Sequence, residues 1–305
     1  MAVEGQTTER AIAPTLGQAT RVTAERRAPS SRLASRIVFI LLLLGFTVLF
    51  VYPFIWLLSA SLKSGNEVFN GELIPSPVQW ENYPNLINDQ PILAWSWNSV
   101  IVSFLAASAV TLSSALVAFA FAYFRFPGRN IVFGLVLAGL LLPGAVTMIP
   151  TFLIWDALGF NNTLVPLWAG NIFASPFYIF LMRQFFLTLP RELWDAAKVD
   201  GANPLRMWWS IALPLTKAAL VVVFVFELKA AWTELVKPLI FLRDVTLFTL
   251  PRGLKAIIDN PSIGGEKNYE LLAVAGVIVT VPMIIIFFIG QRYFVEGIAT
   301  TGSKG

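Results

Sequence analysis

The chain has 305 residues, of which 56% are hydrophobic and only 13% are charged, with a formal net charge of +4. Soluble domains of this length carry charged residues at about a quarter of their positions, so this composition indicates a membrane protein. The chain contains no cysteine and no histidine, which excludes disulfides, thiol nucleophiles, histidine bases and Cys/His metal sites. A small basic excess in a membrane chain reflects topology rather than binding of nucleic acid.

The N-terminal residues 1–36 are polar, rich in Ala, Thr and Arg, and lack a periodic apolar pattern. We expect them to form a disordered cytoplasmic tail. A basic start before an apolar run is also typical of a secretory signal. The run at 37–62 is longer than a signal core and lacks a small-residue cleavage site, so an uncleaved first span is favoured.

Six stretches are long and apolar enough to cross a membrane, since about 20 helical residues span a hydrocarbon core of ~30 Å. The sequence therefore predicts an all-α integral membrane protein with six transmembrane helices and no separate soluble domain. Several spans contain Pro or Gly, which a helix bundle tolerates but which often bend a span. The six stretches are 37–62, 98–124, 131–156, 163–186, 215–239 and 270–291.

Basic residues in the connections set the expected orientation. They are in excess in the N-terminal tail, around 125–129, and between 183 and 217, whereas the segments 63–97 and 240–269 hold fewer. Both termini are therefore predicted to be cytoplasmic, including a C-terminal tail at 297–305 that follows a permease domain at 37–296. The two outer segments are rich in Pro, Gly and Asn, and we expect short interfacial helices and turns there.

The loop at 188–214 is the most informative connection. Pro190 suits the first turn of a helix, and Glu192 and Asp195 lie near the positive end of its dipole. Gly201 suits the left-handed conformation that ends a helix, and Asn203-Pro204 suits the start of the next one. Residues three and four positions apart lie on the same face of a helix. Such a face is formed here by Leu193, Ala196, Ala197 and Asp200. The two alanines make this face flat enough for close approach to a partner.

A helix in this loop has two interpretations. It could lie on the lipid headgroups, as many interfacial helices do. Anionic lipids on the cytoplasmic side would repel Glu192, Asp195 and Asp200, and the apolar face is small for lipid anchorage. Docking to a water-soluble partner is therefore favoured.

Charges also lie inside the fifth predicted span, where Glu227 and Lys229 are about 12–15 Å deep. A charge at such depth costs roughly 2.5–3.5 kcal/mol, so these side chains should face protein or water. Glu227, Lys229 and Glu234 could bridge helices, within the bundle or to another subunit. Alternatively, Glu227, Trp232, Thr233 and Glu234 could line a wet pathway, where carboxylates accept sugar hydroxyls and the indole stacks on a pyranose ring.

The loop resembles the cytoplasmic motif of ATP-binding cassette (ABC) importer permeases, written EAA, three residues, G, nine residues, I-x-LP. Here the motif runs from Asp195-Ala196-Ala197 through Gly201 to Ile211-Ala-Leu213-Pro214, with aspartate in place of the glutamate. Further segments resemble the sugar-importer branch, and most closely the maltose-type second permease. They include Arg125-Phe-Pro-Gly-Arg129, Phe180–Phe186, Thr249–Leu254 and Trp232-Thr233-Glu234. In the last of these, Thr233 stands where the family usually has Asn after Trp.

The resemblance implies a type I ABC importer permease fold with a cytoplasmic coupling helix, in a bacterial inner membrane. It implies a transport subunit rather than an enzyme, with no cofactor or metal of its own, because ATP and Mg²⁺ would bind the partner ATPase. The expected partners are a second permease forming a heterodimer, two ATP-binding subunits, an extracytoplasmic sugar-binding protein and membrane lipid. The motif implies coupling to the ATPase through Glu192, Asp195, Ala196, Ala197, Asp200, Gly201, Ile211, Leu213 and Pro214.

The expected cargo is a sugar, a di- or oligosaccharide, moved into the cytoplasm by alternating access. Two other classes remain open from the sequence. An ion-coupled secondary transporter could use Glu227 and Glu234 as coupling acids, but it leaves the docking loop unexplained. A membrane-embedded enzyme would need a carboxylate pair or a glycine-rich phosphate site near an interface, and the sequence contains neither.

Overall fold

The computed structural model describes residues 29–259 and 268–302, and within these ranges every regular element is a helix. Short 3-10 turns separate several α-helices (η1 Gly65–Glu67, η2 Gly139–Leu141, η3 Ala169–Phe173, η5 Val245–Leu247), and η4 (Trp208–Ala212) is a π turn. The α-helices are α1 Pro29–Ala60, α2 Asn82–Asp89, α3 Ile92–Tyr123, α4 Arg129–Ala138, α5 Gly144–Ala157, α6 Val165–Trp168, α7 Pro176–Thr188, α8 Arg191–Val199, α9 Pro204–Met207, α10 Leu213–Leu215, α11 Lys217–Thr233, α12 Val236–Phe241, α13 Leu250–Asp259 and α14 Tyr269–Gly302.

The chain forms two compact units, residues 1–53 and 54–305. The described part of the first unit is the portion of α1 that begins at Pro29. The predicted tail at 1–36 is thus wrong for 29–36, which are helical, and its remainder lies outside the described residues. At the other end, α14 continues to Gly302, so the predicted tail at 297–305 is helical up to that residue. Residues 303–305 lie outside the description.

Among the described residues, three helices are long and apolar enough to cross a membrane, at Leu33–Ala60, Ile92–Tyr123 and Tyr269–Gln291. Three more crossings exist only if each of three bent helix pairs counts as one span. The pairs bend by 98° between α4 and α5, by 41° between η3 and α7, and by 82° between α10 and α11. Of the six predicted spans, three correspond to continuous helices, and the other three correspond to bent pairs that count as crossings only under that condition.

Two of the three bends have a local cause. Pro143 follows η2 and lacks the N–H that would continue the helix, so α5 starts in a new direction. Ala174 has a positive φ of 65° just before Pro176 at the start of α7. The predicted fifth span at 215–239 is wrong at its C-terminal end, because α11 stops at Thr233 and the chain turns at Glu234. Sequence hydropathy does not detect such turns, since the flanking residues stay apolar.

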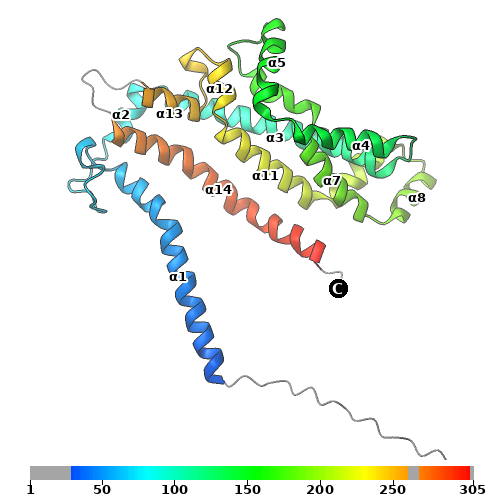
Figure 1. Ribbon diagram of the computed structural model, residues 1–305, viewed down its shortest axis with the longest axis horizontal. Helices are drawn as coiled ribbons and strands as arrows, with labels where there is room; N and C mark the ends of the chain where they lie inside the picture. Colours follow the sequence, from blue (N-terminus) through cyan, green and yellow to red (C-terminus); the bar gives the residue numbers. More distant parts are fainter. Residues whose placement is uncertain (1–28, 260–267, 303–305) are drawn as a thin grey trace, which may run out of the picture. The chain divides into compact units, whose positions relative to one another are not determined.

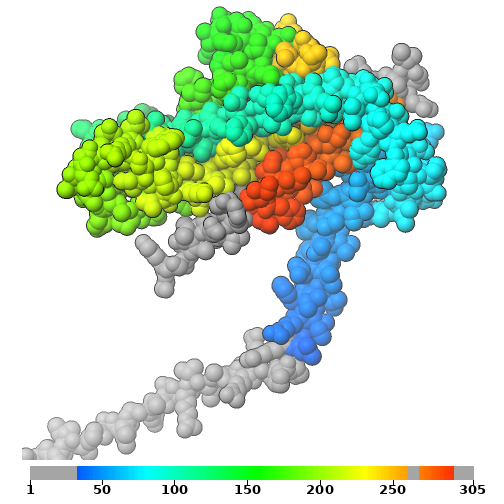
Figure 2. Space-filling model, turned by 180° about the vertical axis from the view of Figure 1, so that it is seen from behind, coloured from blue at the N-terminus to red at the C-terminus, as the bar shows by residue number. Residues whose placement is uncertain are grey.

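The second unit is built around α3, which at ~1.5 Å per residue is about 48 Å long and exceeds the hydrocarbon core. Small residues on its buried face let α7 and α11 approach closely. Figure 1 shows α8 near one end of α3 and α2 with α13 near the other, and Figure 2 shows this separation from behind. The small buried residues of α3 include Ser99, Ser103, Ala106, Ala107, Ser114, Ala115 and Ala118.

The described parts of segments 63–97 and 240–269 meet at the α2–α13 end and contain short helices and turns, as predicted. Trp95 donates its indole N–H to the carbonyl of Val245 at 2.7 Å. The Asn98 amide donates to the carbonyls of Thr246 and Phe248 at 2.9 and 3.0 Å. These bonds join segments about 150 residues apart and satisfy backbone groups that the irregular 240–249 stretch leaves open.

Gly253 is required where α13 crosses Trp95. A methyl group at Gly253 would overlap the Trp95 ring, which is almost fully buried and cannot move aside. We expect Gly253→Ala to destabilise the second unit by about 1–3 kcal/mol through overpacking. Thermal unfolding of the solubilised protein measures this change. Gly134→Ala, at a helical glycine with open space around it, is the control, and equal melting of the two variants would contradict the expected overlap.

Candidate docking site and membrane pathway

Helix α8 is the helix that was predicted in the 188–214 loop. Pro190 immediately precedes it, and Gly201 follows it with a φ of +72°. The Gly201 N–H donates to the carbonyl of Lys198 at 3.0 Å, and the Ala202 N–H donates to that of Ala197 at 2.9 Å, which closes the C-terminus. Both the helix and its glycine stop are confirmed.

The chain after Gly201 turns into α9 as predicted. The Asn203 side chain accepts a hydrogen bond from the backbone N–H of Arg206 at 2.8 Å, and Pro204 occupies the first turn. The π turn η4 then leads to the I-x-LP part of the motif. Ile211 and Leu213 pack against the apolar cluster at this end of the bundle, whereas Pro214 is exposed. Ile211 and Leu213 therefore hold the loop on the bundle.

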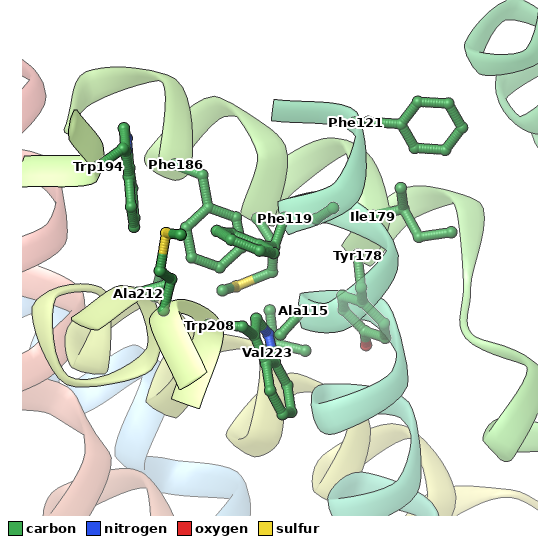
Figure 3. Packing of buried hydrophobic residues seen from close by; sticks show 14 of the residues in the cluster. Ala115, Phe119, Phe121, Tyr178, Ile179, Phe186, Trp194, Trp208, Ala212 and Val223 are labelled. Carbon is green, nitrogen blue, oxygen red and sulfur yellow. The ribbon is translucent and has the colours of Figure 1, made fainter. Parts of the chain in front are cut away.

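Helix α8 is anchored to the bundle by Trp194. The indole is 8% exposed and meets the rings of Phe119 and Tyr123 on α3 edge to face, with centroids 5.6 and 5.9 Å away. Phe186 of α7 contacts Phe119 from the other side, and Figure 3 shows Trp194, Phe186 and Phe119 gathered together. Edge-to-face aromatic pairs add about 0.5–1.5 kcal/mol to the burial of apolar area. The sequence analysis did not identify this anchoring role of Trp194.

Ala197 is buried beside Trp194, with 6% of its surface exposed. The prediction that Ala196 and Ala197 share a flat face for a partner is therefore wrong for Ala197, which faces the bundle. The reason is that Trp194, one turn earlier, turns that side of the helix inward. Ala197 is small because α8 lies close to the bundle there.

The side of α8 that is open to a partner consists of Glu192, Ala196, Val199 and Asp200, which we call the docking face. Val199 projects from it with 88% of its surface exposed. The docking face thus combines two carboxylates with one exposed apolar side chain, which is a surface suited to a protein partner. The sequence identified the acids and Ala196 but missed Val199, which the helix stop leaves at the tip.

Asp195 lies on a different side of α8 from the docking face. Its carboxylate accepts from the Lys198 ammonium at 3.2 Å, and that ammonium lies 5.3 Å from the centroid of the Tyr123 ring. The hydrogen bond to Asp195, with a smaller contribution from Tyr123, raises the pKa of Lys198. The pair is exposed and contributes little to stability, but it fixes Asp195 beside the bundle.

Glu227 lies in a polar layer between the two apolar clusters of the bundle. Its carboxylate accepts a hydrogen bond from the side-chain amide of Asn171 at 2.5 Å and lies near the Tyr178 hydroxyl. Asn171 also donates to the carbonyl of Ala106 at 3.3 Å, and its own carbonyl accepts from Ser113 at 3.1 Å. Glu227 therefore ties α11 to α3 and to the break before α7. Lys229 is exposed on another side of α11.

Trp232 and Glu234 occupy different surroundings. The Trp232 ring is buried and donates its N–H to the carbonyl of Val279 in α14 at 3.1 Å. Glu234 follows α11, and its carboxylate accepts from the backbone N–H groups of Val236 and Lys237 at 2.8 and 3.4 Å. Glu234 and Lys237 form no ion pair among the described residues, because α11 ends at Thr233 and Lys237 belongs to the separate helix α12. Thr233 is exposed, and its hydroxyl donates to the carbonyl of Lys229.

Glu227 and Glu234 both line a small cavity of about 60 Å³ between α3, α11 and α12. The buried Thr249 hydroxyl also lines it and has no hydrogen-bond partner among the described atoms. Such a space accommodates about two water molecules rather than a sugar ring. Of the four predicted pathway residues, the structure brings the two carboxylates together and leaves the indole facing α14.

Three comparisons place the chain among known proteins. Residues 114–300 match the family described as binding-protein-dependent transport system inner membrane component. The chain is 32% identical to the arabinooligosaccharides transport system permease protein AraQ of Bacillus subtilis (strain 168), over 88% of this chain and 96% of that protein. It is 31% identical to the sn-glycerol-3-phosphate transport system permease protein UgpE of Yersinia pestis bv. Antiqua (strain Antiqua), over 85% of this chain and 94% of that protein.

A third relative is the diacetylchitobiose uptake system permease protein NgcG of Streptomyces coelicolor, 31% identical over 88% of this chain and 89% of that protein. Among solved structures, the chain resembles a subunit in the crystal structure of a bacterial ABC transporter involved in the import of the acidic polysaccharide alginate. The TM-score is 0.76 at 24% identity, over 88% of this chain and 99% of that one. This likeness shows the fold.

Replacement of Trp194 by alanine tests how α8 is held. We expect Trp194→Ala to loosen α8 by about 3 kcal/mol, the usual cost of removing a buried aromatic ring. Hydrogen exchange of the amides of residues 191–199 should become faster by roughly two orders of magnitude or more. Trp209→Ala, which removes a 62% exposed ring from the same loop, is the control. Unchanged exchange in α8 of Trp194→Ala would show that other contacts hold the helix.

Proposed function

Because the chain belongs to the family of binding-protein-dependent transport system inner membrane components and is the permease subunit of an ABC importer, we propose that it carries a di- or oligosaccharide into the cytoplasm. The names of two relatives support this cargo, since they concern arabinooligosaccharides and diacetylchitobiose. A third name concerns a glycerol phosphate, which is also a small polyol derivative. Family membership sets aside the ion-coupled transporter and the membrane enzyme that the sequence left open.

The observation that carries the mechanism is the geometry of α8. The helix is anchored through Trp194 and Ala197 at one end of α3, and its docking face is open. A rigid helix held on a bundle can transmit a push, whereas a mobile loop would absorb it. We propose that the docking face contacts a separate ATP-binding subunit and that Asp195–Gly201 transmits nucleotide-driven motion to α3, α7 and α11.

This mechanism requires partners outside the chain. We propose a heterodimer with a second permease, two ATP-binding subunits that hold ATP and Mg²⁺, and an extracytoplasmic sugar-binding protein. The orientation follows: α8 and both termini lie on the cytoplasmic side, and the α2–α13 end faces the binding protein. Closure of the ATPases would turn the permeases outward, and the sugar would pass when they return.

For the pathway we propose Glu234 and Thr233 as groups that meet the sugar. Both lie at the break between α11 and α12, where the backbone leaves the helix and polar groups are accessible. Irregular backbone at membrane depth is found where it is buried in protein or lines a wet cavity. Glu227 supports this break through Asn171, and Trp232 fixes α11 on α14, so both position the pathway.

Gly201 tests the coupling. Its φ of +72° is strained for any side chain, although the space around it is open, and Gly201→Val should cost about 1–3 kcal/mol locally. We expect the end of α8 to shift, so that ATP hydrolysis continues while sugar uptake in proteoliposomes falls by roughly tenfold or more. Gly159→Val, with the same strain at a φ of +78° and open space on the outer side, is the control. Normal uptake per ATP in Gly201→Val would contradict the coupling role.

Glu234 tests the pathway separately from the fold. Glu234→Gln keeps an oxygen that can accept the α12 N–H groups but removes the charge. We expect the sugar concentration for half-maximal uptake to rise by roughly three- to tenfold, since a bond to a charged acceptor is worth about 1 kcal/mol more than a neutral one. Glu81→Gln, an exposed acid on the outer side, is the control. An unchanged half-saturation value in Glu234→Gln would remove Glu234 from the pathway.

A further inference from the structure

A cavity of about 580 Å³ lies between α8 and the ends of α3 and α7. One wall is a stripe of α8, formed by Arg191, Trp194, Asp195 and Lys198 at steps of three and four residues. The facing wall is the end of α3 with the residues that follow it, Tyr123, Phe124 and Arg125, and the end of α7 closes the cavity. Its volume is in the range of small-molecule sites. It lies beside the docking face and does not include it.

The charges in this cavity do not balance. The only carboxylate in its lining, Asp195, is paired with Lys198 at 3.2 Å. Arg125 and Arg191 are exposed and form no ion pair among the described residues. The guanidinium groups of Arg125, in the turn after α3, and of Arg191, at the start of α8, therefore line the cavity without a neutralising carboxylate. In a concave site, fields of one sign add. The composition fits an anionic group such as a phosphate, which arginine binds well.

More positive charge adjoins the cavity along the α3–α4 turn. Arg125 also lines a shallow depression with Arg129, whose guanidinium donates to the Phe124 carbonyl at 3.2 Å. Arg183 of α7 stacks on Phe133 with its guanidinium carbon 4.4 Å from the ring centroid, and its buried Nε has no hydrogen-bond partner among the described atoms. The bundle side of this end is thus basic apart from Asp195, which is paired with Lys198, and the remaining acids of α8 lie on the docking face.

The depth of the cavity indicates a lipid. Phe124 and Arg125 follow directly after Tyr123, the last residue of the apolar helix α3, and α3 is longer than the hydrocarbon core, so in the orientation proposed above its end reaches the headgroup region. The aromatic rings of Tyr123, Phe124 and Trp194 line the same site, and such rings favour the interface. Basic pockets between helices on the cytoplasmic side are a recurrent form of anionic headgroup site.

We propose that this cavity binds the phosphate of an anionic phospholipid, held by Arg125 and Arg191, with the acyl chains alongside α3 and α7. The proposal rests on the cytoplasmic placement of α8 given above. A bound headgroup bridges α8 to the end of α3, beside the Trp194 anchor. The lipid composition of the inner leaflet would thereby change how strongly α8 is held on the bundle.

The test uses the complete importer in proteoliposomes of phosphatidylcholine containing a photoactivatable phosphatidylglycerol. Arg125→Gln/Arg191→Gln removes the two unpaired cations. Arg206→Gln/Lys217→Gln removes two exposed cations of the same predicted membrane side, outside the cavity. We expect labelling of the peptides around Phe124 and Phe186 to fall roughly tenfold in the first variant and to stay unchanged in the second.

Equal labelling of these peptides by the lipid in the two variants would overturn the proposal. Loss of labelling on addition of inorganic phosphate would identify a soluble anion as the ligand and also overturn it. Sugar uptake by the unaltered importer is measured in the same vesicles. Absence of uptake with normal lipid labelling would count against the proposed transport function alone, and the reverse result would count against the lipid site alone.

Discussion

The burial of Trp194 against Phe119 and Tyr123 is the contact on which the coupling account depends. It converts a nine-residue helix, which would not be stable alone in water, into a fixed projection of the bundle. It also decides which side of α8 is open: Ala197 is turned inward, and Val199 is left at the tip. Without this anchor, the acids of the loop would be attached to a flexible segment and could not transmit force.

The long helix α3 connects the two functional ends. At one end it receives α8, and at the other Trp95 and Asn98 bind the segment 245–248. Between these ends, Glu227 and Asn171 form a polar layer that links α3, α7 and α11. Packed helices rather than loops therefore connect α8 to the break at Glu234, and in the proposed mechanism a displacement of α8 would pass along them. This continuity is a physical basis for alternating access, in which small movements switch the bundle between two arrangements.

The sequence predicted the features that rest on local chemistry. Gly201 and the Asn203-Pro204 cap have conformations that few other residues allow, so the helix and its ends could be placed in advance. The tertiary contacts could not be predicted from the sequence. The inward side of α8 depends on where Trp194 finds aromatic partners, and the role of Trp232 depends on a carbonyl 47 residues away. The bend at Pro143 was foreseen in kind, because proline and glycine inside a span often bend it, whereas the turn at Glu234 was missed because hydropathy averages over it.

The chain contains no cysteine, so a crosslinker attached to one introduced cysteine is linked to this chain at that position only. A single cysteine at Ala196 or Val199, carrying a thiol-linked photo-crosslinker, reports what the docking face touches in the assembled importer. The account predicts efficient crosslinks to the ATP-binding subunit from both positions, and none from a cysteine at Leu187, which lines the cavity behind α8. Crosslinks from Val199 to lipid or to this chain alone, with none to the ATPase, would contradict it.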